Sequence, residues 1–485
     1  MVNFFKKNYY KIVVISIILL AAFLRFYNFE NRWGLAYDQA HDALIARYAV
    51  SHMKLPLLGP FSSAGAFQTG GEWYWIIMLG TVIFPWSIVG PWVFITIIYV
   101  LFVLLIIIFA KELIDKKFSL IVGLITAVST AQIAQGVSLT NQSPLAIFSL
   151  FSLWCSIRFI RTKKRRYLFL LGLFVGTAAS IHLQGVALIM LVFLTLLLSG
   201  IPRIADLFVI ILGLFIPWIP VAIVDLQNNF YNTRNMIQYY LHDQYKISLD
   251  VLGRRWLTYL GVFWPKMWSF VAGGNVVFGY LMGVALVLVS LYKIWKKSLT
   301  KEWIIVLFSF IGIIVIMRYT RTPLFASYIV VLHPFILLLS GWLIYFLYQK
   351  QKIVGSIVLF LIIFFSLQQT IGEITFAGNT IIVNNSKLLR DKLIKQFPNS
   401  KFAIYDLQNK STVASFPLVL FLDEKGLISD KGKKMGVINK IDTYYKMTDL
   451  QKKKNEQLRK EVWYLITPEK IYLSTEEWYK RDTRY

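Results

Sequence analysis

The sequence predicts an α-helical polytopic membrane protein of about eleven transmembrane helices, followed by a small C-terminal α/β domain. Of its 485 residues, 57% are hydrophobic and only 16% are charged, whereas soluble domains carry roughly 25% charged residues. The formal net charge is +26, but the charges stand in short clusters between long apolar runs, so they do not indicate a nucleic-acid partner. The single Cys155 lies in an apolar run, which excludes an internal disulfide framework and a thiol-ligated metal site.

A bilayer core requires about 20 apolar residues of helix. Ser180, His182 and Gln184 interrupt the long stretch 167–200, which is therefore divided into two short helices. The first stretch follows a basic start but lacks the small residues of a signal-peptide cleavage site, so we expect it to stay as a span. The predicted spans are 12–29, 91–110, 118–136, 143–160, 167–181, 184–200, 204–225, 276–294, 303–317, 324–347 and 353–371.

Basic clusters near the span ends predict the orientation, because they collect on the cytoplasmic side. They all fall on that side only if the short, Trp-rich stretch 73–86, broken by Gly80 and Pro85, does not cross; a full crossing is the alternative. We therefore expect a partly embedded or re-entrant segment there, a cytoplasmic N-terminus and a multi-pass protein of the cell membrane. The clusters are Lys6 to Lys11, Lys111 to Lys117, Arg158 to Arg166, Lys293 to Lys301, and Lys350 with Lys352.

This arrangement divides the chain at residue 372. Residues 1–372 form the membrane body, with large outer loops at 30–90 and 226–275. Residues 373–485 are polar and are predicted to form an extracytoplasmic domain. Within it, 401–406 and 462–467 have strand-like patterns, 386–397 has a helix-like pattern, and a second helix is expected at 412–423.

The densest set of ionisable residues follows the first span, in residues 31–50. If this segment is helical, Asp38, His41 and Asp42 lie within one turn, with Asp38 and Asp42 on one face. A carboxylate just beyond a span can act as a general base on an acceptor hydroxyl or amine. Asp38 and Asp42 could instead hold a divalent cation with the histidine, although that ligand set is sparse. A polar helix lying on the membrane with its charged face in water is an equally good interpretation.

Other polar residues stand at predicted span ends and could support an acceptor or donor site. Glu72 follows two glycines, Asn141 and Gln142 precede a helix that starts at Pro144, and His182 lies at the break between two short helices. Each also has a purely structural explanation. The glycines make a turn, proline favours the first turn of any helix, and a lone histidine at a break is more often structural than catalytic.

Arg318 and Arg321 lie at the outer end of a predicted span, and Tyr328 follows on the next one. Arginine forms strong bidentate hydrogen bonds with phosphate, so this pair could hold an anionic lipid headgroup. Snorkelling of arginine toward the interface would explain the same positions equally well.

The order of these motifs resembles the GT-C superfamily of polytopic glycosyltransferases. It is most similar to the branch that contains protein mannosyltransferases and the lipid A aminoarabinose transferase, that is, to glycosyltransferase family 39. The resemblance covers the membrane body, and each motif is short. The residues that carry it are Tyr37, Asp38, Gln39, Asp42 and Arg47; Gly70, Gly71, Trp73, Tyr74 and Trp75; Thr140 to Pro144; Pro217, Pro220 and Asp225; and Arg321, Tyr328 and Pro334.

The resemblance implies that Asp38 is the catalytic base, that the donor is a polyprenyl-phosphate-linked sugar, and that Arg318 or Arg321 stabilises the leaving lipid phosphate. Two departures from the family pattern stand out. Gln39 replaces the second acidic residue of the usual pair, and Asn141 with Gln142 stand where an aspartate is common. Both weaken the case for a bound metal, so no cofactor is expected to be required.

We therefore expect a glycosyltransferase, hexosyl- or pentosyl-transferring, that acts at the outer face of the cytoplasmic membrane among membrane lipids. The acceptor stays open between a glycolipid, a cell-wall polymer and a protein. A transporter or flippase of lipid-linked saccharides is the alternative, as is a non-catalytic scaffold of the same fold. Transporters usually carry internal repeats and midplane ionisable residues, and neither is clear in this sequence.

Overall fold

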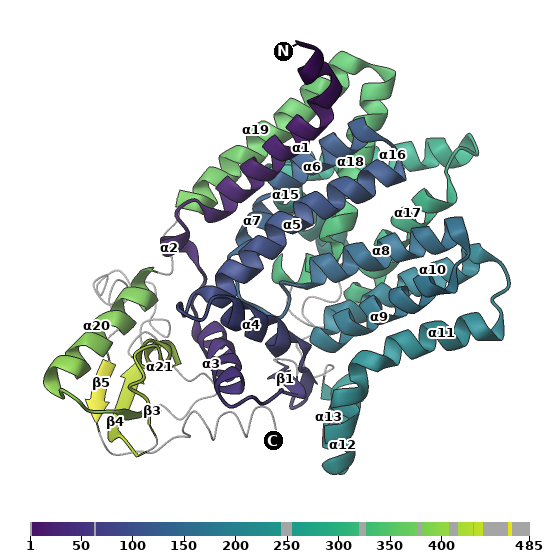
Figure 1. Ribbon diagram of the computed structural model, residues 1–485. Helices are drawn as coiled ribbons and strands as arrows, with labels where there is room; N and C mark the ends of the chain where they lie inside the picture. Colours follow the sequence, from purple (N-terminus) through teal and green to yellow (C-terminus); the bar gives the residue numbers. More distant parts are fainter. Residues whose placement is uncertain are drawn as a thin grey trace.

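The computed structural model describes residues 2–62, 65–243, 255–319, 326–375, 380–406, 416–429, 431–439 and 464–467. Figure 1 shows a bundle of long helices, with a small region of strands and helices beside one end of it. The predicted fold class, a polytopic helical membrane protein, is confirmed. Some predicted features lie outside the described residues: Arg321, residues 324–325 of the predicted span 324–347, residues 244–254 of the predicted outer loop 226–275, and the parts of the two predicted tail elements at 412–415 and 462–463.

Seven described helices are long and apolar enough to cross a membrane. The described parts of all eleven predicted spans lie mainly on helices. Three of the spans correspond to α9 (Arg165–Ile181), to η1 (Leu183–Leu188) with α10 (Ile189–Ser199), and to α17 (Lys301–Tyr319). The seven are α1 (Val2–Phe26, apolar from Asn8), α5 (Gly90–Leu113), α8 (Leu145–Thr162), α11 (Ile204–Phe215) continued by η2 (Ile216–Trp218) and α12 (Ile219–Gln227), α16 (Val276–Trp295), η5 (Ala326–Leu332) continued by α18 (His333–Lys350), and α19 (Lys352–Thr375).

The predicted span 118–136 is bent by 57° between α6 (Lys116–Ala127) and α7 (Thr130–Gly136). The buried Arg25 of α1 lies at this break. Its guanidinium donates hydrogen bonds to the carbonyl oxygens of Ala127 (3.1 Å) and Thr126 (3.4 Å). A cation at a helix C-terminus is favourable, because it satisfies free carbonyls and opposes the helix dipole. Arg25 therefore closes α6, and the side chain of Ser129 caps the start of α7.

Helix α4 (Glu72–Ile83) occupies the stretch predicted to be only partly embedded. Its 12 residues make a helix of about 18 Å, shorter than the roughly 30 Å hydrocarbon core. It packs between α3 (Tyr37–Ser51) and α5. A short antiparallel hairpin precedes it, in which β1 (Leu58–Phe61) pairs with β2 (Gln68–Gly70).

The predicted outer loop 226–275 contains helices that its sequence pattern did not identify. They are α13 (Tyr231–Leu241), the short α14 (Arg255–Thr258) continued by η4 (Tyr259–Phe263), and α15 (Trp264–Val271). Helix α15 packs into the bundle, where the indole of Trp268 donates a hydrogen bond to the hydroxyl of Ser340 in α18 (3.0 Å). The end of this segment is thus part of the helical body.

The described part of the tail combines helices and strands. Helices α20 (Thr380–Gln396) and α21 (Phe416–Asp423) accompany a sheet of order β3-β4-β5, made by β3 (Phe402–Asp406), β4 (Lys433–Asn439) and β5 (Tyr464–Thr467). Strand β3 runs parallel to β4, and β4 runs antiparallel to β5. Helix α21 is apolar and buried, and it packs against α3.

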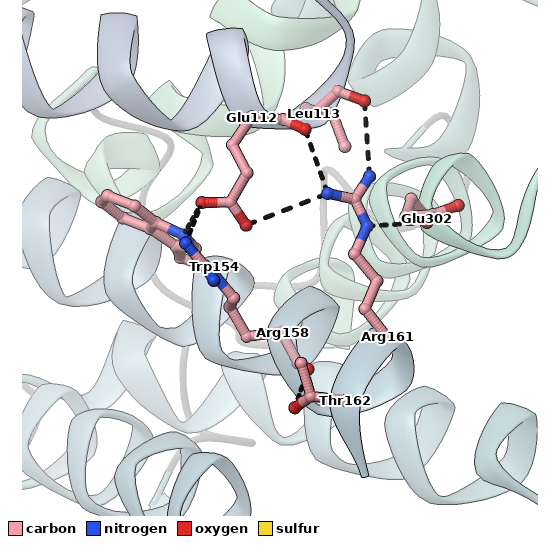
Figure 2. Close-up of polar contacts among 7 residues, drawn as sticks. All are labelled: Glu112, Leu113, Trp154, Arg158, Arg161, Thr162 and Glu302. Carbon is pink, nitrogen blue, oxygen red and sulfur yellow. Dashed lines mark hydrogen bonds and ion pairs between the residues drawn. The ribbon is translucent and has the colours of Figure 1, made fainter. Parts of the chain in front are cut away.

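A polar network joins α5, α8 and α17 at the end of the bundle opposite to α3. The carboxylate of Glu112 accepts hydrogen bonds from Trp154 (3.0 Å) and Arg158 (2.5 Å), while Arg161 pairs with Glu302 (2.9 Å), as Figure 2 shows. Three of the predicted cytoplasmic clusters begin or end on these helices. The structure therefore places them together at one end of the bundle.

Candidate functional site

The position of α3 is fixed by the segment that precedes it. The backbone N–H of Gly34 donates to the carbonyl oxygen of Val137 (3.0 Å), and the Gly34 carbonyl accepts from the indole of Trp92 (2.9 Å). These bonds attach the segment around Gly34 to α5 and to the residue that follows α7. Helix α3 begins three residues later, at Tyr37. Asp38 then stands in the first turn, where a negative charge is favoured by the helix dipole.

Asp42 is buried and its carboxylate is fully engaged. One oxygen accepts a hydrogen bond from the indole of Trp73 (2.7 Å), and the other lies 3.1 Å from Nδ1 of His41 and 3.4 Å from the hydroxyl of Tyr74. Trp73 and Tyr74 belong to α4. Asp42 therefore joins α3 to α4 and has little capacity left for a ligand.

Asp38 is the opposite case, although it lies one turn away on the same helix face. Its side chain is exposed, and within the described residues it accepts no hydrogen bond and forms no ion pair. The surrounding protein removes part of its hydration, which raises the pKa of Asp38, and the negative charge of Asp42 raises it further, while His41 lowers it. The free carboxylate of α3 is thus Asp38, with a raised proton affinity.

Glu72 is a buried carboxyl group at the start of α4. One oxygen accepts a hydrogen bond from the hydroxyl of Ser180 at the end of α9 (2.9 Å), and the other has no partner. Burial raises the pKa of Glu72 to about 7. A Cβ on Gly70 would lie 2.0 Å from the Ser180 hydroxyl, so this glycine, which ends β2, permits the contact by its lack of a side chain.

The break after α9 brings together His182, Gln142 and Tyr328 from three segments. Nδ1 of His182 accepts a hydrogen bond from the backbone N–H of Gln184 (3.2 Å), so the neutral ring carries its proton on Nε2. That nitrogen lies 3.2 Å from the amide of Gln142, whose oxygen can accept the proton once the amide is turned toward the ring. The ring of Tyr328 lies 5.8 Å from the histidine ring.

Asn141 and Gln184 fix the backbone around this break. The amide of Asn141 donates to the carbonyl oxygen of Ile181 at 3.5 Å. Gln184 donates to the carbonyl oxygen of Ser327 (3.2 Å) and accepts from the backbone N–H of Val331 (3.3 Å), which holds η5 against η1. Sequence reasoning noted Gln184 only as an interruption of an apolar run. Its polar side chain inside that run was the available signal.

Arg318 lies in the last turn of α17 and is buried. Its guanidinium lies over the ring of Trp256 at 5.0 Å, and its Nε has no hydrogen-bond partner. Among the residues that the structure describes, no carboxylate pairs with it. The side chain therefore does not extend into water as a snorkelling arginine would, and its charge is not neutralised by a described acid.

Hydrogen bonds link several of the predicted site residues that the structure describes. Asp42 on α3 is bonded to Trp73 on α4, the neighbouring Glu72 is bonded to Ser180 at the end of α9, and His182, two residues further along, contacts Gln142. Arg318 makes no contact with this group among those described, although α17 packs against η1. No three His, Cys, Asp or Glu side chains gather in a metal-binding cluster within the described ranges. The expectation that no metal is required stays a prediction.

The chain is similar to several known proteins. The model of the dolichyl-phosphate-mannose-protein mannosyltransferase family matches residues 73–224. No curated protein matches significantly. Among solved structures, ArnT from Cupriavidus metallidurans in the apo state is 14% identical, with 93% of this chain and 95% of that chain covered and a TM-score of 0.62.

Two further structures contain lipid phosphates. ArnT from the same organism, bound to undecaprenyl phosphate, is 13% identical, with 92% and 95% coverage and a TM-score of 0.58. The archaeal oligosaccharyltransferase AglB from Archaeoglobus fulgidus, in complex with an inhibitory peptide and a dolichol-phosphate, is 13% identical, covers 91% of this chain and 71% of that chain, and has a TM-score of 0.54. At identities this low, the structural matches establish a shared fold and nothing further.

Proposed function

Because this chain has the fold of the GT-C superfamily of membrane glycosyltransferases, we propose that it transfers a sugar from a polyprenyl-phosphate-linked donor to an acceptor hydroxyl or amine. We place the reaction at the outer face of the cytoplasmic membrane, with the N-terminus in the cytoplasm and the tail outside. The donor class is supported by the undecaprenyl phosphate and dolichol-phosphate in the similar structures.

The observation that carries the proposal is the contrast between the two carboxylates of α3. Asp42 is held by Trp73, Tyr74 and His41, whereas Asp38 is free of partners in the described part of the chain. In the proposed reaction the carboxylate of Asp38 takes the proton of the acceptor. A raised pKa makes it a stronger base, which is the direction that general-base catalysis needs near neutral pH.

The second requirement is a place for the leaving group. As the acceptor atom forms its bond to C1 of the sugar, the bond from C1 to the phosphate oxygen breaks, and the electron pair remains on the lipid phosphate. Arg318 offers a guanidinium that has no acidic partner among the described residues and lies over the ring of Trp256. We assign it to the lipid phosphate, together with Arg321, because charge developing on an oxyanion is stabilised by a positioned cation.

The remaining polar residues fit supporting roles. Glu72, Asn141, Gln142 and His182 lie around the end of α9 and could hydrogen-bond a sugar or an acceptor. Tyr328 is proposed beside the phosphate. The donor sugar, hexosyl or pentosyl, and the nature of the acceptor are not specified by this set. No metal is assigned a role.

The test uses purified full-length chain in proteoliposomes with native membrane extract as acceptor and a polyprenyl-phosphate donor whose sugar is radiolabelled. Asp38→Asn should reduce release of polyprenyl phosphate by about 10²–10⁴-fold, the usual contribution of a general base. Asp391→Asn is the matched control, since it removes an exposed carboxylate of α20 that, among the described residues, pairs only with the neighbouring Arg390. Full activity of the Asp38 variant would refute the base. Movement of the donor across the vesicle without transfer would favour a transporter.

A further inference from the structure

A groove of about 330 Å³ lies between α1 and α5, at the end of the bundle opposite to α3. Its floor is aliphatic and includes Val14, Leu104 and Ile107, while Tyr10, Lys11 and Lys111 stand at its mouth. The apolar part of α1 starts at Asn8, and α5 ends at Leu113. The mouth therefore lies where the two spans leave the hydrocarbon, and the floor extends along the part of both helices that faces lipid.

No acidic side chain in the described part of the chain pairs with the lysines at the mouth. Lys11 and Lys111 are exposed, and neither forms an ion pair within the ranges that the structure describes. The two carboxylates nearest in sequence are already occupied. Glu112 binds Trp154 and two arginines of α8 (Figure 2), and Asp115 caps α6 and accepts a hydrogen bond from Tyr345.

Tyr10 brings the ammonium groups of two lysines to its ring, and one of the two, Lys111, lines the groove. Its hydroxyl is hydrogen-bonded to that of Ser119 in α6 (3.0 Å), which fixes the ring. The ammonium groups of Lys111 and Lys116 lie 5.4 and 5.7 Å from the ring centroid, within cation–π range. Lysines that serve only to orient the chain need no such arrangement, because the positive-inside rule depends on their number and side alone.

We propose that this groove binds an anionic glycerophospholipid such as phosphatidylglycerol. The headgroup phosphate lies between Lys11 and Lys111, and one acyl chain follows the aliphatic floor. Basic pockets between membrane helices are suited to such headgroups. The site is separate from the proposed donor site, which lies at the other end of the bundle, and it does not depend on the proposed function.

The test measures binding of phosphatidylglycerol and of phosphatidylcholine to the purified full-length chain in detergent, by native mass spectrometry. The wild type should retain phosphatidylglycerol preferentially. Each of Lys11→Ala and Lys111→Ala should weaken its binding about fivefold, the equivalent of about 1 kcal/mol per lysine. The matched control is Lys164→Ala with Lys350→Ala, which removes two exposed lysines at the same end but outside the groove.

A second variant tests the floor. Leu104→Trp fills the groove and keeps both lysines, so it should also lose phosphatidylglycerol. The proposal is overturned if phosphatidylcholine binds as tightly as phosphatidylglycerol. It is equally overturned if the control variant at Lys164 and Lys350 loses as much affinity for phosphatidylglycerol as the Lys11 and Lys111 variants lose. It is also overturned if undecaprenyl phosphate displaces phosphatidylglycerol, because the occupant would then be the donor lipid. The lysine variants decide the matter if the tryptophan variant does not fold.

Discussion

Glu72 gives the most direct quantitative prediction. Its carboxyl group is buried, one of its oxygens has no partner, and its pKa rises from a usual 4.5 to about 7. At 1.36 kcal/mol for each pH unit of difference, the folded protein loses about 3 kcal/mol when this group is ionised. We predict that Glu72→Gln, which keeps the shape and an acceptor for Ser180 but cannot ionise, is more stable than the wild type at pH 8.

The sign of the pH dependence follows from the two pKa values. Below about pH 4.5 the carboxyl group of Glu72 is protonated in the folded and the unfolded chain, so wild type and variant differ little. Between pH 4.5 and 7 the unfolded chain ionises first, and the wild type loses stability. Above pH 7 the loss is complete and constant.

The assay is the melting temperature of the detergent-purified chain, followed by tryptophan fluorescence between pH 5 and pH 8. The difference between Glu72→Gln and the wild type should grow through this range in favour of the variant. Glu30→Gln, at an exposed position of α2 (Phe29–Arg32), is the control and should follow the wild type. Parallel curves for wild type and Glu72→Gln would refute the reasoning, because a carboxyl group that ionises equally in both states costs nothing on folding.

Three further outcomes follow from the site. Asp42→Asn removes a negative charge that raises the pKa of Asp38. The acid limb of the pH–rate profile for sugar transfer should therefore move to lower pH, and an unchanged profile would contradict this. Arg318→Ala should lower the transfer rate at saturating donor by about 10²–10³-fold, whereas equal rates would exclude the phosphate role. Gly70→Ala should destabilise the fold by about 1–3 kcal/mol, measured as a lower melting temperature, because its Cβ would lie 2.0 Å from the Ser180 hydroxyl; a normal melting temperature would show that the contact can relax.

Much of the helical body could be predicted because span length follows from the length of an apolar run. The described parts of the eleven predicted spans lie mainly on helices. The bend between α6 and α7 could not be predicted in the same way, since Arg25, which satisfies the free carbonyl groups at the break, belongs to another helix. Helix α15 was not predicted, because a Trp-rich sequence is typical of the membrane interface. Its contact with Ser340 of α18 shows that it belongs to the bundle.

The same distinction applies to the candidate site: the spacing of residues along one helix could be predicted, and their contacts with other helices could not. The spacing of Asp38 and Asp42 placed them on one helix face, and this part is confirmed. Their different surroundings could not be predicted, because the partners of Asp42 come from α4, across a hairpin and a turn. Ser180, the partner of Glu72, belongs to a helix more than a hundred residues further along. Local pattern gives the residues of such a site, and tertiary packing decides which of them remain free.

The bond between Arg25 and the end of α6 has a consequence for the order of assembly in the membrane. The two groups are 102 residues apart, and at about 5–20 residues per second the ribosome needs on the order of 5–20 seconds to make the intervening chain. During that time the first helix carries a cation without its final carbonyl partners. Insertion of the first helix and its docking in the bundle are therefore distinct events in biogenesis, separated until α6 emerges and closes over the arginine.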